Sequence, residues 1–217
     1  MTIVASARAT EVAVDVGHYA AEPGVISASG VPEFEFNRAL AFEIKKELEQ
    51  FELKVSLIGE RGDYAVLHHR TRDARGAELF VSIHHDSVQE RLLPEAHRFA
   101  GYSLFISRFN PQLEKSLACA SAIGAQLRGA GFTPSRYHAD PVDGESRPFA
   151  DEANGVHYYD NLAVARSAAM ASVLVEAGVI VNRDEEQRMR DPAVRARIAA
   201  SIASGVLECL TRGKTLQ

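Results

Sequence analysis

The sequence has no long hydrophobic run and no excess of positive charge, and each absence excludes a class of protein. No segment approaches the roughly 18 consecutive apolar residues that a membrane-spanning helix needs. The 24 lysines and arginines are outnumbered by 29 aspartates and glutamates, which gives a net charge of −5. Proteins that bind nucleic acid usually carry a basic patch, so this balance argues against nucleic acid as a partner.

Cysteine is also scarce, since the chain has only Cys119 and Cys209, both in segments with helical periodicity. Neither belongs to a CxxC pair or another metal-binding spacing, and no HExxH motif is present. We therefore interpret the two cysteines as small buried hydrophobic residues.

The N-terminal residues 1–12 are too short and too polar for a complete secretion signal. Three interpretations stay open: removal of a leader from a longer precursor, action in the cytosol, and export that needs no leader. The sequence does not choose among them.

Predicted strands and helices alternate along the chain. Apolar, β-branched runs predict strands, and these cover residues 11–17, 53–58, 78–83, 101–107 and 171–178. Apolar residues at helical spacing predict helices, and these cover residues 35–51, 64–75, 111–130 and 192–210, with a short helix after the capping residue Asn182. This alternation predicts a single domain over residues 1–217 with an α/β fold, in which a mostly parallel central sheet is flanked by helices on both faces.

Residues 133–161 interrupt this pattern. The segment contains three prolines, two glycines and six acidic residues, and it shows no clear periodicity. We predict one long loop insertion there, which is either a lid or specificity wall or a merely decorative insertion. Its prolines interrupt any long helix. Several of its side chains could reach a metal ion, namely His138, Asp140, Asp143, Glu145, Asp151, Glu152 and His157.

Three ionisable residues stand at the ends of predicted strands. They are His18 after the first strand, His84 after the third and Glu176 near the end of the fifth. Ligands collect at the carboxyl ends of strands in an open α/β sheet, and a charge at the end of an apolar run is costly unless it is paired or bound to metal. A shared metal site is one interpretation. Taken singly, His18 could cap a turn, His84 could be a hydrogen-bonded core histidine, and Glu176 could pair with a buried arginine.

Four blocks of sequence resemble those of the zinc-dependent N-acetylmuramoyl-L-alanine amidases, the Amidase_3 family. They are VAVDVGHYAAEPG at 12–24, PEFEFNRALA at 32–41, LFVSIHHDS at 79–87 and LAVARSAAMASVLVEAGVIVN at 162–182. The resemblance covers nearly the whole chain, from about Val12 to Leu210. It implies a three-layer sandwich like that of other zinc hydrolases.

The resemblance also implies one catalytic Zn²⁺ ion, bound by His18, Glu33 and His84. The ligand glutamate of the family lies four residues before an asparagine, which is Asn37 here, so this role falls on Glu33 and not on Glu35. Two imidazoles and one carboxylate leave a tetrahedral zinc ion with one open position, as in catalytic sites.

Glu176 matches the family's catalytic glutamate, and the resemblance implies that it passes a proton from water to the leaving amine. The implied reaction is hydrolysis of the amide bond between N-acetylmuramic acid and L-alanine, so peptidoglycan or a muropeptide is the expected substrate. A periplasmic or extracellular location is expected from that substrate. In some family members an insertion blocks the zinc until a partner binds, so a regulatory protein partner is considered as well.

Three residues match family positions around the expected ligands. We interpret Asp15 and Asn37 as residues that orient the ligands from behind. Arg70 is expected to form a structural ion pair beneath the site rather than to contact the substrate.

Two neighbours of the expected ligands depart from the usual family pattern. Tyr19 is bulky where a glycine is common, and it would narrow the groove beside the metal. His85 follows the expected ligand where a small residue is usual, so it would approach the substrate or, in a shifted register, would be the ligand itself. Adjacent strand residues face opposite sides, and the family match favours His84 as the ligand.

Two alternatives from other classes are weighed. A zinc carboxypeptidase would need a cation to hold the substrate carboxylate, and Arg136, Arg147 or Arg166 could supply it, although nothing in the sequence marks them for that role. A non-catalytic peptidoglycan-binding relative would keep the fold without turnover, although all four key residues are present.

Overall fold

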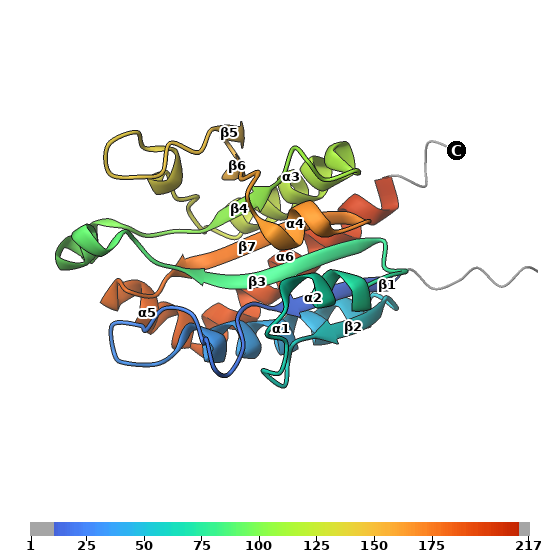
Figure 1. Cartoon of the computed structure of the whole chain (residues 1–217), viewed down its shortest axis with the longest axis horizontal. Helices are drawn as coiled ribbons and strands as arrows, with labels where there is room; N and C mark the ends of the chain where they lie inside the picture. Colours follow the sequence, from blue (N-terminus) through green and yellow to red (C-terminus); the bar gives the residue numbers. More distant parts are fainter. Residues whose placement is uncertain (1–10, 213–217) are drawn as a thin grey trace, which may run out of the picture.

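The structure, a computed structural model, describes residues 11–212. Residues 1–10, on which the secretion-signal question rests, therefore lie outside the described residues. Within the described range, seven strands form one mixed sheet in the order β2-β1-β3-β7-β4-β6-β5 (Figure 1). No helix in this range is long and apolar enough to cross a membrane.

The strands and helices follow the alternation predicted from the sequence. The strands are β1 (Glu11–Val16), β2 (Lys54–Ile58), β3 (Leu79–Asp86), β4 (Ser103–Ile106), β5 (Phe149–Asp151), β6 (Val156–Tyr158) and β7 (Ala171–Val179). The α-helices are α1 (Glu33–Gln50), α2 (Leu67–Asp73), α3 (Leu113–Gly129), α4 (Ala163–Ser167), α5 (Arg183–Arg190) and α6 (Pro192–Arg212), and the 3₁₀ helices are η1 (Glu90–Arg98) and η2 (Tyr137–Ala139).

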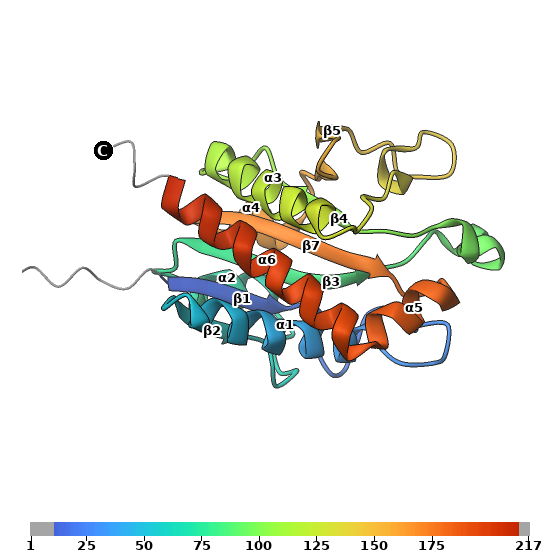
Figure 2. The same cartoon turned by 180° about the vertical axis from the view of Figure 1, so that it is seen from behind.

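Helices cover both faces of the sheet. Helices α1, α3 and α6 lie across one face (Figure 2), and α2 and α4 lie on the other (Figure 1). The side chains of Val14, Ile83 and Val175 belong to the larger core cluster under α1, α3 and α6, whereas Ala13 and Leu174 pack on the opposite face. Successive strand residues face opposite sides. His84 and Glu176 directly follow Ile83 and Val175, so their side chains lie on the face that α2 and α4 cover. The predicted three-layer α/β fold is confirmed.

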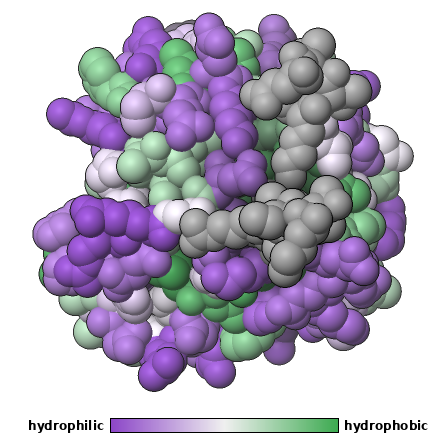
Figure 3. Space-filling model, turned by 90° about the vertical axis from the view of Figure 1, so that its right-hand side faces the viewer, coloured by the Kyte–Doolittle hydropathy of each residue, from purple (hydrophilic) through white to green (hydrophobic). Residues whose placement is uncertain are grey.

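Strands β2, β1, β3 and β7 are parallel neighbours, so their carboxyl ends meet at one edge of the sheet. Strand β4 runs antiparallel to β7, and β6 returns parallel to β4. The opposite end of the molecule carries mostly hydrophilic side chains around small, separate hydrophobic areas (Figure 3). Because β1 and β3 are parallel neighbours, the polar residues that follow them lie together at the carboxyl edge of the sheet.

Residues 133–161 differ from the single long loop that the sequence predicts. They contain η2 and the two short strands β5 and β6. Leu104 of β4 pairs with Val156, and Ile106 pairs with Tyr158, which adds the segment to the edge of the sheet. The sequence did not reveal these strands because three residues are too few for an alternating pattern, and their hydrogen bonds come from a distant segment. Residues 140–148 remain as the irregular part.

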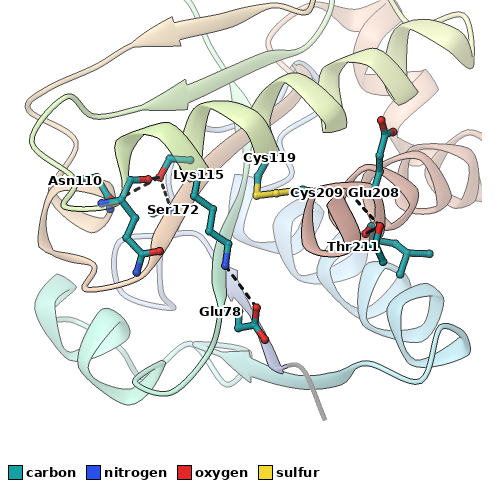
Figure 4. Close-up of a disulfide and its surroundings, with 11 residues drawn as sticks. Glu78, Asn110, Lys115, Cys119, Ser172, Glu208, Cys209 and Thr211 are labelled. Atoms are coloured by element: carbon teal, nitrogen blue, oxygen red, sulfur yellow. Dashed lines mark hydrogen bonds and ion pairs between the residues drawn. A yellow bond between two sulfur atoms is a disulfide. The ribbon is translucent and has the colours of Figure 1, made fainter. Parts of the chain in front are cut away.

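Cys119 of α3 and Cys209 of α6 form a disulfide, with 4.9 Å between their Cα atoms (Figure 4). The two helices approach closely because Gly205 has no side chain, and a Cβ there would lie 2.5 Å from the Cα of Ile123. Both cysteines are buried, as the sequence predicts, and the structure adds the disulfide between them. The pairing depends on the packing of two helices far apart in sequence, which spacing alone does not show.

Candidate metal centre

Three ligand side chains come together at the carboxyl edge of the sheet. His18 follows β1, His84 lies near the end of β3, and Glu33 is the first residue of α1. One ligand atom from each lies within 4.8 Å of the others, and no other His, Cys, Asp or Glu of residues 11–212 joins them. The structure thus brings together the three residues that the sequence predicts as metal ligands.

The ligand atoms converge on both oxygens of Glu33. His18 Nε2 lies 2.9 Å from Glu33 Oε2, and His84 Nδ1 lies 3.1 Å from Glu33 Oε1. Burial raises the pKa of Glu33, but the hydrogen bonds and charges of the two imidazoles outweigh it and hold the pKa well below its usual range. Two imidazole nitrogens and an ionised carboxylate are the donor set of catalytic zinc sites. The donor set therefore fits a zinc ion.

Two glycines make room for these ligands. A Cβ on Gly17 would lie 2.4 Å from the His84 ring, and a Cβ on Gly24 would lie 2.3 Å from Glu33 Oε2. Gly24 also has a φ of 80°, in the region that favours glycine. Neither position tolerates a side chain without displacement of a ligand.

A buried ion pair fixes the backbone that carries His18. The Arg70 guanidinium is buried and donates to Asp15 Oδ1 at 2.7 Å and to the carbonyl oxygen of Val16. It also donates to the carbonyl oxygen of His18, whose φ is 66°. Ser82 donates to the second oxygen of Asp15 at 2.6 Å. The structure places Arg70 and Asp15 beneath the ligands, in the structural ion pair that the sequence predicts for Arg70.

His85 faces the opposite side of β3 from His84. Its ring is buried against α1, with Nδ1 2.8 Å from Asn37 Oδ1. Asn37 in turn donates to Glu33 Oε1 at 3.0 Å, and the backbone N–H of His85 donates to the same oxygen. Burial lowers the pKa of His85 to about 4, so its ring is neutral at pH 7. His85 and Asn37 thus orient Glu33, and His85 does not face the site.

Glu176 lies beside His84 on the neighbouring parallel strand β7, where the two residues are Cα partners. Its Oε2 atom is buried and has no hydrogen-bond partner among the described residues. Burial raises the pKa of Glu176 well above its usual value, and the carboxylates of Asp86 and Glu33 raise it further. A carboxyl group in this setting can hold a proton at neutral pH and release it.

Two cavities flank this row of side chains, and Leu162 and Leu174 line both. The first, of about 390 Å³, lies beside His18 and His84, and Tyr19 forms part of its wall. The second, of about 290 Å³, lies beside Glu176. The two cavities adjoin at Leu162 and Leu174, with His84 in the wall of one and Glu176 in the wall of the other, and we call them together the groove.

The segment from η2 to Arg147 lines the second cavity. His138 is buried, with Nε2 2.7 Å from Asp86 Oδ2 and Nδ1 2.6 Å from Glu145 Oε2. Arg147 contacts the same Glu145 at 2.8 Å. These side chains therefore pair with one another beside Glu176 and do not join the ligand cluster, contrary to the expectation that the acidic and histidine residues of this segment could reach the metal.

Comparison with known proteins agrees with this arrangement. The profile of the N-acetylmuramoyl-L-alanine amidase family, Amidase_3, matches residues 12–208. The chain belongs to this family.

Named relatives share this amidase domain. N-acetylmuramoyl-L-alanine amidase AmiC of Neisseria meningitidis is 29% identical over 92% of this chain and 52% of its own length. The probable amidase AmiB of Haemophilus influenzae is 26% identical over 94% of this chain and 52% of its own length. The chain thus spans about half the length of these two curated relatives.

Solved amidase structures have the same fold. The catalytic domain of CwlV, an N-acetylmuramoyl-L-alanine amidase from Paenibacillus polymyxa, is 28% identical to this chain and has a TM-score of 0.73 over 93% of it and 98% of that domain. An amidase from Clostridium difficile has a TM-score of 0.77 at 20% identity, over 94% of this chain and 98% of that chain. Nearly the whole catalytic domain of CwlV is therefore represented in this chain.

Sequence reasoning missed part of the amidase groove. It did not single out Asp86, although this residue directly follows the two histidines and pairs with His138. It considered Arg147 only as a candidate clamp for a carboxypeptidase, and the structure places it in the cavity beside Glu176. The signal that could have found Arg147 is the dense mixture of charged and aromatic residues from 136 to 159.

Proposed function

We propose that this chain hydrolyses the amide bond between N-acetylmuramic acid and L-alanine in peptidoglycan, with one Zn²⁺ ion held by His18, Glu33 and His84. The observation that carries the proposal is the convergence of these three ligand atoms beside the unpartnered carboxyl oxygen of Glu176. Family membership favours this reaction over the carboxypeptidase and the non-catalytic alternatives.

The charge and the orientation of Glu33 suit the binding of a divalent cation. Glu33 stays ionised because its pKa is held well below neutrality by the neighbouring imidazoles. The hydrogen bond from Asn37 and the buried His85 behind it limit the rotation of the Glu33 carboxylate. A bound zinc ion would supply a Lewis acid that activates water and polarises the substrate carbonyl group.

Glu176 carries the proton in the proposed reaction. Its carboxylate accepts a proton from the attacking water and then donates it to the leaving nitrogen of L-alanine. A pKa raised by burial suits both steps, because the protonated form must be reachable at neutral pH. The side chain needs no movement of the backbone for this role, since it projects from the rigid strand β7.

We also propose that the protein acts outside the cytosol, in the periplasm or beyond the cell. The expected substrate supports this location, and so does the disulfide between Cys119 and Cys209, because such bonds persist in oxidising compartments. Regulation by a protein partner stays a prediction, and residues 137–147 beside Glu176 are the place where such a partner could act on the groove.

The test compares wild type with His84→Ala and Glu176→Ala on purified sacculi. We expect His84→Ala to lose zinc and turnover together, and Glu176→Ala to keep zinc and lose turnover. Mass spectrometry of a defined muropeptide digest should show the intact stem peptide, whereas a carboxypeptidase would trim a single residue. Equal release of new amino groups by all three proteins would overturn the proposal. Glu49→Ala serves as a control, because Glu49 is exposed and pairs with Lys45 at the end of α1 opposite to Glu33.

A further inference from the structure

We propose that Arg147 binds a carboxylate group of the stem peptide in the cavity beside Glu176. This inference rests on the proposed amidase function, and it names the group of the substrate that the cavity binds. Glu176 returns a proton to the leaving nitrogen, so the peptide side of the scissile bond lies on the side of Glu176. The cavity of about 290 Å³ on that side is the one that Arg147 lines.

The Arg147 guanidinium group is held in one orientation. It lies 3.4 Å from the centroid of the Tyr159 ring and 5.2 Å from that of Phe105, so aromatic rings support its plane. Its side chain is 17% exposed, and Nη2 lies 2.8 Å from Glu145 Oε2. Stacking and one ion pair fix a flexible side chain before any ligand arrives, which reduces the entropy lost on binding.

Arg147 keeps hydrogen-bonding capacity for a ligand. A guanidinium group has five N–H donors in a planar fork, and Glu145 is its only acidic partner among the described residues. Glu145 is shared, because the same Oε2 atom also lies 2.6 Å from His138 Nδ1. Asp86 is the second acidic partner of His138, at 2.7 Å, so two carboxylates balance the two cations, and a ligand would meet the remaining N–H donors of Arg147 rather than an excess of charge.

A carboxylate is the ligand group that matches this arrangement. The fork of arginine forms two parallel hydrogen bonds with a carboxylate, and the aromatic rings around it reduce competition from water. Arg147 and Glu176 line the same cavity of about 290 Å³, so one small substrate segment in it can touch both groups. The carboxylate could come from the second or the third residue of the stem peptide.

The test uses two pairs of synthetic muropeptides. In one pair the α-carboxyl group of the second residue is free or amidated, and in the other pair a carboxyl group of the third residue is free or amidated. We expect wild type to prefer the free carboxylate in one pair by roughly tenfold to a hundredfold in kcat/KM. The pair that shows the preference identifies the source of the carboxylate.

The Arg147→Gln variant should lose this preference, so that its kcat/KM for the free-carboxylate substrate falls to its own value for the amidated partner. Arg136→Gln is the matched control, because Arg136 lies in the same segment but is exposed and pairs with Glu152. The control should keep the full preference. A purely structural role of Arg147 would instead lower the turnover of free and amidated substrates by the same factor, which would overturn the proposal.

Binding provides a readout that does not depend on turnover. Calorimetry on the Glu176→Gln variant should give tighter binding of the free-carboxylate muropeptide than of its amidated partner. The combined variant with Arg147→Gln should bind both equally. If wild type cleaved no muropeptide but this difference in binding persisted, the proposed reaction would fail and the carboxylate site would stand. Equal binding of both partners in each pair would overturn the carboxylate site alone.

Discussion

The buried Arg70 guanidinium donates a hydrogen bond to the carbonyl oxygen of His18, a ligand residue whose backbone has a φ of 66°. The left-handed region is unfavourable for a residue other than glycine. His18 keeps this conformation because Arg70 holds its carbonyl oxygen and Glu33 holds its imidazole ring. One ion pair inside the protein thereby directs the His18 ring into the metal centre.

Replacement of Arg70 by lysine should weaken metal binding without removal of a ligand. Lysine keeps the charge opposite Asp15, but its single ammonium group does not reach the acceptors that the guanidinium fork contacts. We expect zinc affinity to fall by about tenfold, a typical loss for residues that orient a ligand. Competition with a chelator measures this change. Arg72→Lys, on the exposed side of the same helix, should leave the affinity unchanged, and an equal loss in both variants would contradict the argument.

Replacement of Gly17 by alanine should displace a ligand sterically. The new Cβ atom would lie 2.4 Å from the His84 ring, which is too close for any real contact. We expect weakened zinc binding and loss of turnover in a protein that still folds. The Gly129→Ala variant is the control, because a Cβ there meets nothing within 4 Å. Circular dichroism should show both variants folded, and full zinc affinity in Gly17→Ala would refute the prediction.

The ion pairs of His138 should make stability depend on pH. Burial lowers the pKa of His138, but the carboxylates of Asp86 and Glu145 outweigh this and raise it to about 9 from its ordinary 6.5. Because the folded protein holds the proton more tightly, this stabilisation is complete below pH 6.5 and is lost as pH rises through 9. The other ionisable neighbours, His157 and Arg147, carry no negative charge and do not favour the imidazolium form.

Denaturant unfolding at several pH values measures this effect. The free energy of unfolding of wild type should fall by roughly 3 kcal/mol, relative to that of His138→Gln, between pH 6.5 and 9. Parallel pH profiles for the two proteins would show that His138 is not held as an imidazolium ion.

Removal of the disulfide should lower stability without a direct effect on the groove. The bond closes a segment of 90 residues between Cys119 and Cys209, so it strongly restricts the unfolded chain. We expect the Cys119→Ser, Cys209→Ser variant to lose about 2–4 kcal/mol in the free energy of unfolding. A reductant should destabilise wild type by a similar amount and leave the variant unaffected. The same response of both proteins to reductant would indicate that the bond does not form in solution.

Local patterns were sufficient to predict most of the fold. Strand Leu79–Asp86 is buried on both faces and begins as a continuous apolar run, whereas helix Glu33–Gln50 buries one stripe, so both patterns appear directly in the sequence. The short strands β5 and β6 were not predicted, because β6 is held by pairing with β4 more than forty residues earlier and β5 in turn pairs with β6. Alternation along β3 correctly separated the directions of His84 and His85, since neighbouring strand residues face opposite sides.

By itself the sequence determined the family, the placement of His18, His84 and Glu176 at strand ends, and the identity of Glu33 as the third expected ligand. Only the tertiary structure decided how close the ligand atoms lie, which cysteines pair and which cavity Arg147 lines. The physical reason is the range of the interactions involved. Periodicity and family blocks record the surroundings of each residue along the chain, whereas a metal centre, a disulfide and a substrate cavity are made by side chains that meet only after the sheet and its helices have packed.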